Sequence, residues 1–446
     1  MASRLSVLAR GSLLCVTAFA VFSACAAPAT SEPAGDQLRL VIILSRHGVR
    51  APLRANAAMQ QFAAESWPSW ETAPGIQTPT GDHLVSLMGD YYRERFTAAG
   101  LLTGDAATDA PLVFIRADND QRTIQTGRLI GKGLVPAAML EIHAMPEGTP
   151  DGLFQPFKAN IGRPDPLMAS SAILGRIGGN PRNLDKAYAP QFAELDRVLW
   201  GAGSPQTIES VAGATAIEPG RKNYLVQVSG SLLAAEQCID SLLLEYSDGK
   251  PDKDVGWGRV GEKEMTSLLT LHELFFDLVD RSFYPAQVGA SNLASHIVDT
   301  LEQAAGSDPV PGAIGPPGER VVVIAGHDSN IAEIGGLFGL NWCISGTQMN
   351  PMLPAGALLF ELWKGTGAKD PYYVRLSYVT QDLAQLRSAA ALSLDSPPAR
   401  APIYIPGCSG PAPTFDAPLP AFIRQARKVI APAFVADDPA SEEDTP

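Results

Sequence analysis

Long apolar runs are scarce in this chain of 446 residues. No uninterrupted apolar stretch reaches the roughly 18 residues that a membrane-spanning helix needs, so we expect no transmembrane span. Basic residues are also few, because 34 Lys and Arg stand against 47 Asp and Glu, which gives a net charge of −13. This charge argues against nucleic acid or anionic lipid as a partner. A site for an anionic ligand must therefore be a local concentration of positive charge in an acidic protein.

Cysteine is rare as well. The chain has five cysteines, which are Cys15, Cys25, Cys238, Cys343 and Cys408. No two of them have the CxxC spacing, and none is paired with histidine at the spacing of a structural zinc site, so we expect no metal site. The first two lie in the N-terminal leader described next. The other three allow at most one internal disulfide, and the sequence leaves open which two would pair.

The first 26 residues have the pattern of a signal peptide. Arg4 and Arg10 precede a short apolar segment over residues 11–24, as in secretory leaders. The end of this segment resembles both an A-x-A cleavage site and a bacterial lipoprotein box that would put a lipid on Cys25. We therefore expect a periplasmic or secreted protein, either soluble or lipid-anchored at the outer membrane. Residues 27–36 read as a linker, and the acidic tail over 435–446 is predicted to be disordered.

The rest of the chain alternates between apolar β-branched runs and amphipathic stretches. We predict strands at residues 38–44, 111–115, 140–143, 320–324, 357–363 and 372–378, and helices at 78–96, 120–133, 330–337 and 419–430. This alternation is typical of an α/β fold with a central, mainly parallel sheet flanked by helices. Residues 37–150 and 265–434 would form that domain. Residues 151–264 carry helical patterns and would form an inserted helical domain.

Two of the predicted strands end in the same way. The first runs into Arg46-His47-Gly48-Val49-Arg50, and the strand at 320–324 runs into His327-Asp328. Catalytic groups of open α/β sheets gather at the carboxyl ends of the strands, so both histidines can face one crevice.

These residue types suit one reaction. Arginine binds phosphate oxygens bidentately and stays charged, a neutral imidazole is a competent nucleophile, and a carboxylic acid can protonate a leaving alkoxide. The set predicts hydrolysis of a phosphomonoester, a small-molecule substrate, through a phosphohistidine.

The same residues carry a resemblance to a known family. Residues 46–52, RHGVRAP, resemble the RHGxRxP signature of the histidine acid phosphatases, and His327-Asp328 resembles their distal HD motif. The stretch DNDQRTIQTG, residues 118–127, is similar to the family segment that holds a further phosphate-binding arginine, here Arg122. Shorter segments similar to those of bacterial periplasmic phytases extend the resemblance over residues 37–434.

The resemblance implies a role for each site residue. His47 would be the nucleophile and Asp328 the proton donor. The phosphate would be bound by Arg46, Arg50, Arg122 and His327, with Arg54 at the rim for further phosphates of the substrate. The family uses no metal or other cofactor, and its fold is a phosphoglycerate-mutase-like α/β domain with an inserted helical domain. We expect a monomer and treat the other histidines, His83, His143, His272 and His296, as structural.

The substrate remains open between two members of that family. Gly48-Val49 and Arg54 favour a phytase, which would act on myo-inositol hexakisphosphate, whereas Leu53 resembles the glucose-1-phosphatases. Phosphoglycerate mutases share the RHG start but lack the RHGxRxP form. A further alternative is a lipoprotein that binds a phosphorylated ligand without turnover. Most cysteines of the related phytases are missing here, and only Cys408 matches one.

Overall fold

The computed structural model describes residues 35–54, 56–222, 224–306, 308–367 and 371–436. The predicted signal peptide with Cys25, most of the linker and the tail beyond residue 436 lie outside these ranges. Among the described residues, none of the helices is both long and apolar enough to span a bilayer. Cys238, Cys343 and Cys408 are free thiols.

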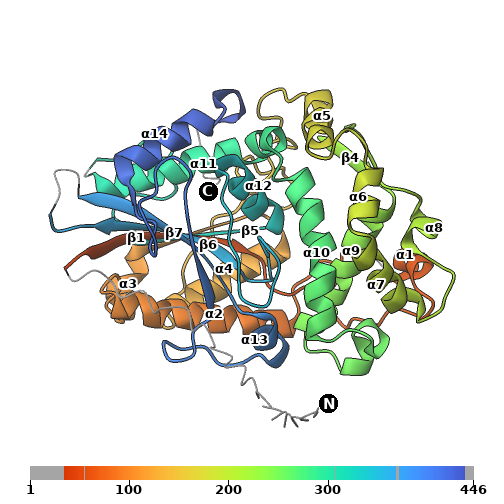
Figure 1. Ribbon diagram of the computed structural model, residues 1–446. Helices are drawn as coiled ribbons and strands as arrows, with labels where there is room; N and C mark the ends of the chain where they lie inside the picture. Colours follow the sequence, from red (N-terminus) through yellow and green to blue (C-terminus); the bar gives the residue numbers. More distant parts are fainter. Residues whose placement is uncertain (1–34, 55, 223, 307, 368–370, 437–446) are drawn as a thin grey trace, which may run out of the picture. The chain divides into compact units, whose positions relative to one another are not determined.

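A mixed sheet forms the centre of the fold, in the order β2-β5-β1-β6-β7-β8 with β9 beside β7 (Figure 1). The parallel core consists of β2 (Val113–Ala117), β5 (Val321–Gly326) and β1 (Gln37–Arg46). Antiparallel strands extend it: β6 (Ala357–Lys364), β7 (Tyr372–Thr380), β8 (Ala399–Ile403) and β9 (Ala417–Pro418). The predicted α/β fold with a parallel core is confirmed. The strand predicted at 140–143 forms only one bridge, between Arg116 and His143.

Strand β1 is apolar along nearly its whole length because helices cover both of its faces. Leu40, Ile42 and Leu44 pack in one core with helices α11 (Phe283–Ala305), α12 (Asp328–Phe338) and α14 (Leu419–Val429). Val41 and Ile43 point the other way, toward α2 (Pro79–Ala98) and α4 (Gln121–Leu134). The alternation of side chains along a strand thus fixes β1 between two helical layers (Figure 1).

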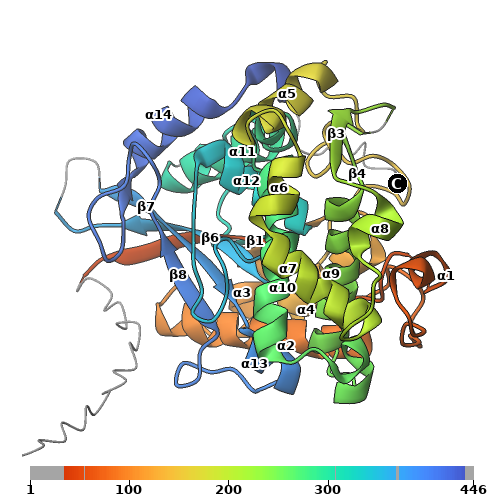
Figure 2. The ribbon, with the colours of Figure 1, turned by 45° about the vertical axis from the view of Figure 1, so that its right-hand side comes forward.

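A third core lies among the helices beside the sheet (Figure 2). Its elements are α5 (Pro166–Arg176), α6 (Arg182–Ala187), α7 (Ala189–Trp200), α8 (Ile208–Ala212), α9 (Ser231–Ser247) and α10 (Glu262–Val279). Residues 59–67 and the short helix α13 (Leu383–Ser388) also contribute side chains. A small hairpin, β3 (Ala216–Pro219) with β4 (Val226–Ser229), lies in this region. Its four-residue strands are mostly exposed, which explains why the sequence showed no apolar run there.

Candidate active site

The two strand ends that carry histidine do meet. Strands β1 and β5 pair in parallel with Arg46 opposite Gly326, and the His47 amide donates to the Gly326 carbonyl at 3.0 Å. The imidazole rings of His47 and His327 follow directly, with their centroids 5.6 Å apart in an edge-to-face arrangement. The register of one strand pair thus places both histidines in one crevice.

The His47 side chain is buried, with 2% of its surface exposed. Nδ1 lies 2.8 Å from the Gly48 carbonyl oxygen. A carbonyl only accepts, so Nδ1 carries the hydrogen and Nε2 keeps its lone pair. Burial, followed by the positive charges of Arg122, Arg50 and Arg46, lowers the pKa of His47 well below its ordinary value. The lowered pKa favours the neutral ring, in which Nε2 keeps the lone pair that a nucleophile needs.

The loop after His47 is fixed by contacts from two helices. The Gly48 amide donates to Gln77 Oε1 at 3.1 Å and to Thr126 Oγ1, on α4, at 3.0 Å. The N-terminus of α2 packs so closely on this loop that a Cβ at Gly81 would lie 2.1 Å from the Val49 carbonyl oxygen. Only a glycine fits where α2 contacts this loop. The contact therefore holds the backbone next to His47 in one position.

Arg46 and Arg50 share a carboxylate that lies on the third-core helix α9. Arg46 Nη2 lies 3.4 Å from Asp240 Oδ1, and Arg50 Nη2 lies 3.1 Å from Asp240 Oδ2. Arg46 also donates to the Met352 carbonyl oxygen and reaches Asp328 Oδ2 at 3.0 Å. Both guanidinium groups are buried, and these contacts orient them toward one side of the crevice.

Asp328 is the first residue of α12, directly after His327. Its backbone neighbour, the Ser329 amide, donates to Asp328 Oδ1 at 2.9 Å. Burial alone would raise the pKa of Asp328, but the nearby Arg46 and His327 charges hold it at about 2. Asp328 is therefore an ionised carboxylate beside Arg46.

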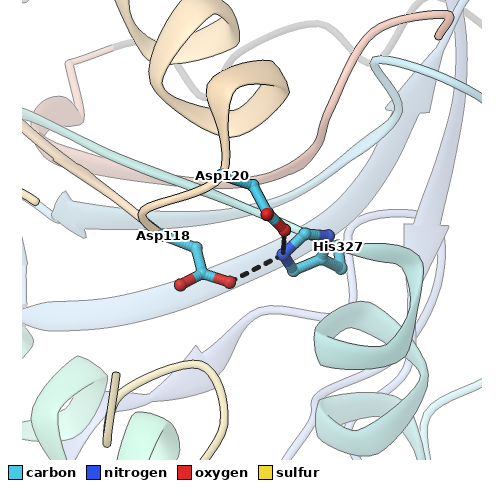
Figure 3. Close-up of side chains that lie close together, drawn as sticks. All are labelled: Asp118, Asp120 and His327. Carbon is cyan, nitrogen blue, oxygen red and sulfur yellow. Dashed lines mark hydrogen bonds and ion pairs between the residues drawn. The ribbon is translucent and has the colours of Figure 1, made fainter. Parts of the chain in front are cut away.

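A third strand end completes the site. Asp118 follows β2, is fully buried, and accepts a hydrogen bond from His327 Nε2 at 2.7 Å (Figure 3). Burial works to raise the pKa of Asp118, but hydrogen bonds from His327 and Gln155 lower it below its ordinary value. Asp118 is thus an anion, and His327 Nε2 carries the hydrogen. This bond fixes the orientation of the His327 ring.

Arg122 lies in the first turn of α4 and belongs to the same cluster. Its Nη2 pairs with Asp120 Oδ2 at 2.6 Å, and the Asp120 carboxylate is also 3.6 Å from His327 Nε2 (Figure 3). Arg122 is the charged group that most lowers the pKa of His47. The structure therefore places Arg122 beside the other charged groups of the crevice.

Asp118, Asp120 and His327 also have ligand-type atoms within 4.8 Å of one another, a spacing at which a metal ion can be held. Metal ligation by His327 Nε2 would require this nitrogen to be unprotonated. Here it donates to Asp118, and Asp120 is paired with Arg122. The geometry fits a hydrogen-bonded network that orders His327 better than a metal centre.

Arg54 lies apart from this cluster. It is exposed on the loop after β1. Beside it, a cavity of about 440 Å³ is lined by Leu53, Gly75, Arg122, Gln155 and Lys158 among others. The wall of this cavity includes Leu53 but not Arg54. The predicted rim role of Arg54 stays a prediction.

Several residues that sequence reasoning did not single out surround the crevice. Asp240 and Glu236 lie one helical turn apart on α9, and burial and the Asp240 charge raise the pKa of Glu236 above its ordinary value. His272 is buried on α10, with Nδ1 3.4 Å from Glu273 Oε1, and its charge acts on the pKa of Asp328. Of these residues and Asp118, only Asp118 had a signal in the sequence, because it also ends a predicted strand.

A buried histidine, a second histidine, three arginines and a carboxylate thus lie together near the ends of three parallel strands, which is the residue set of the histidine-phosphatase class. The family model of the histidine phosphatase superfamily (branch 2) matches residues 37–190 and 239–379. The chain belongs to this family.

Relatives with known names cover most of the chain. Phytase AppA of Escherichia coli (strain K12) is 33% identical over 390 residues, which are 85% of this chain and 89% of the relative. A glucose-1-phosphatase of Salmonella typhimurium is 29% identical over 89% of this chain and 94% of the relative. The structure of a Hafnia alvei phytase in complex with tartrate has a TM-score of 0.82 at 36% identity, covering 91% of this chain and all of that one. The structure of a phytase from Citrobacter braakii has a TM-score of 0.80 at 31% identity, covering 90% of this chain and all of that one.

Proposed function

We propose that this protein is an acid phosphatase that hydrolyses phosphomonoesters through a phosphohistidine on His47. One observation carries the proposal. The unprotonated Nε2 of a buried His47 lies among Arg46, Arg50 and Arg122, opposite a strand end that supplies His327 and Asp328. A nucleophile, a cationic phosphate site and a carboxyl group meet at one place.

In the first half-reaction, His47 Nε2 attacks phosphorus, the new P–N bond forms, and the ester P–O bond breaks. The arginines and His327 bind the non-bridging oxygens, whose charge must be stabilised along this path. The leaving alkoxide takes a proton from Asp328. In the second half-reaction, water attacks phosphorus, Asp328 accepts the proton of that water, and the P–N bond breaks to release phosphate.

The proton on Asp328 has to be supplied, because its pKa of about 2 leaves the carboxylate ionised in the free site. A phosphomonoester loses its second proton near pH 6. Below that pH, the substrate therefore arrives as a protonated monoanion. Its oxygens then compete with Asp328 for Arg46, which weakens the ion pair that keeps the pKa low. We infer that the substrate delivers the proton to Asp328, which restricts efficient turnover to acidic pH.

The substrate that we propose is phytate, myo-inositol hexakisphosphate. Gly48-Val49 and the cation Arg54 support this choice, as do the names of the E. coli, H. alvei and C. braakii relatives. Glucose-1-phosphate, or a broader set of sugar phosphates, is the second candidate, supported by Leu53 and by the glucose-1-phosphatase relatives. A binding protein without turnover is disfavoured because His47 and Asp328 are both present.

A substrate panel tests the proposal. Phosphate release from phytate, glucose-1-phosphate, nucleotides and an aryl phosphate would be measured at pH 4 to 6 for the wild type and for His47→Ala. We expect His47→Ala to lose at least about a thousandfold in kcat on every ester. Equal rates for both proteins would refute the mechanism, and a clear preference for glucose-1-phosphate would replace phytate by the second candidate.

We also propose that the protein is exported to the periplasm or beyond the cell and acts as a monomer. The N-terminal pattern over residues 1–26 supports export and leaves a choice between a soluble form and a lipid anchor on Cys25. Mass spectrometry of the mature N-terminus distinguishes the two, because lipidation adds acyl groups to a chain that begins at residue 25. Light scattering measures the oligomeric state.

A further inference from the structure

A chain of hydrogen bonds leads from the phosphate site to a surface lysine. His327 Nε2 donates to Asp118 Oδ2 at 2.7 Å, and the same oxygen accepts from Gln155 Nε2 at 2.8 Å. The other end of the Gln155 amide, Oε1, accepts from Lys158 Nζ at 2.9 Å. Lys158 is exposed, yet this chain links it to a histidine of the catalytic crevice.

The turn that carries Gln155 and Lys158 is anchored on two sides. Its first residue, Asp151, is buried and pairs with Arg116 of β2 at 2.6 Å. The Phe154 carbonyl accepts from Asn330 Nδ2, on α12, at 2.9 Å. Strand β2 and helix α12 also carry site residues at their ends. The same two elements therefore fix the positions of both the turn and the phosphate site.

Two cavities meet at this turn, and Gln155 and Lys158 line both of them. The cavity of about 440 Å³ on one side has Arg122 in its wall. The cavity of about 370 Å³ on the other side has apolar walls and two carboxyl groups, Asp280 and Glu333. Burial raises the pKa of both Asp280 and Glu333 well above their ordinary values, which favours their neutral forms. The described lining of the second cavity has Lys158 alone as a cation, whereas the first cavity has both Arg122 and Lys158, beside Asp120 and Glu147. A further phosphate of a bound substrate is therefore better accommodated in the first cavity.

We propose that Lys158 is a specificity-determining residue that binds a second anionic group of the substrate in the cavity shared with Arg122. This inference rests on the proposed function and extends it, since it makes polyphosphorylated esters the preferred substrate class. The reacting phosphate occupies the crevice of His47, and Lys158 contacts a neighbouring phosphate on the same molecule. Its bond to Gln155 holds the ammonium at the rim until the substrate arrives.

The kinetic test uses Lys158→Met, Lys158→Arg and a matched control. Lys132→Met removes an exposed lysine from α4, and so changes the net charge equally. We expect the ratio of kcat/KM for phytate to kcat/KM for p-nitrophenyl phosphate to fall about tenfold in Lys158→Met, as for one lost charge-assisted contact. Lys158→Arg should restore most of it, and Lys132→Met should leave it unchanged. A ratio in Lys158→Met equal to that of the wild type would overturn the proposal.

A binding measurement separates this proposal from the proposed function. In the His47→Ala background, calorimetry with myo-inositol hexakissulfate measures binding without turnover. Adding Lys158→Met should raise the Kd about tenfold, and adding Lys132→Met should not. An unchanged Kd refutes the role of Lys158. Equal phosphatase activity of the wild type and His47→Ala would refute the proposed function, whatever the result for Lys158.

Discussion

Replacing Asp328 by asparagine should have two effects of opposite sign. The variant keeps the shape of the side chain and its hydrogen-bond acceptor but loses the negative charge and the transferable proton. Turnover should therefore fall because the leaving alkoxide finds no acid. Phosphate binding should become tighter because the anion no longer competes with a carboxylate for Arg46.

The structure gives the size of the second effect. The pKa of Asp328 is lowered from 3.8 to about 2, which corresponds to about 2 kcal/mol of net stabilisation of the carboxylate. Arg46 Nη2, 3.0 Å away, is the largest favourable contribution. If bound phosphate displaces this contact, removing the carboxylate can tighten binding by up to about 30-fold. We expect a smaller increase in phosphate affinity than this upper limit, because the asparagine oxygen still accepts a hydrogen bond from Arg46.

The assay compares leaving groups. General acid catalysis contributes about 10² to 10⁴ in rate, and its loss matters most for a strongly basic alkoxide. We expect kcat of Asp328→Asn to fall by about that factor on alkyl phosphates but less than about tenfold on p-nitrophenyl phosphate. The inhibition constant of inorganic phosphate should decrease in the same protein.

Asp240→Asn is the matched control, because Asp240 also contacts Arg46 but lies on α9 rather than next to His327. It should tighten phosphate binding without changing the dependence on the leaving group. If alkyl and aryl esters slow equally in Asp328→Asn, the proton-donor role is refuted. If Asp240→Asn shows the leaving-group effect instead, Asp240 is the acid.

Two further predictions concern the charges around the site and the sheet. Replacing Arg122 by methionine should raise KM about tenfold and move the acidic limb of the kcat/KM profile to higher pH, because Arg122 is the charge that most lowers the pKa of His47. Glu361→Gln should cost about 3–5 kcal/mol of unfolding free energy in thermal or urea denaturation, since Glu361 is fully buried between Arg95 at 2.5 Å and Arg400 at 2.9 Å. These arginines hold the pKa of Glu361 at about 2, below its ordinary 4.5. Their stabilisation is complete above about pH 4.5 and is lost as the pH falls toward 2, which denaturation of the wild type across this range would show.

The meeting of the two strand ends that carry histidine was predictable because the signal is local. His47 and His327 each follow an apolar β-branched run directly, and the rule that strand ends converge needs no knowledge of side-chain packing. Asp118 also follows a strand of the parallel core, β2. A lone aspartate after a strand is common, however, and does not by itself indicate a functional site. Its role became visible only through its bond to His327.

The helical side of the site was not predictable in this way. Asp240 reaches Arg46 and Arg50 from a helix 190 residues further along the chain, and no spacing in the sequence encodes that approach. Gln155 and Lys158 lie in a turn whose position depends on contacts with β2 and α12. Contacts of this kind have no local signature in the sequence, which explains why the reaction could be predicted more sharply than the ester.

The pairing of the site's cations with carboxylates also indicates how an acidic protein can keep buried arginines and, under the proposed function, bind phosphate reversibly. Each arginine of the cluster is paired with a carboxylate: Asp328 and Asp240 for Arg46, Asp240 for Arg50, and Asp120 for Arg122. His327 likewise donates a hydrogen bond to Asp118. Leaving any of these charges buried and unpaired would cost several kcal/mol. Phosphate binding is then an exchange of anions rather than the filling of an empty cationic site. The affinity for phosphate is the difference between two strong interactions, so the product, which carries the same group as the substrate, can leave.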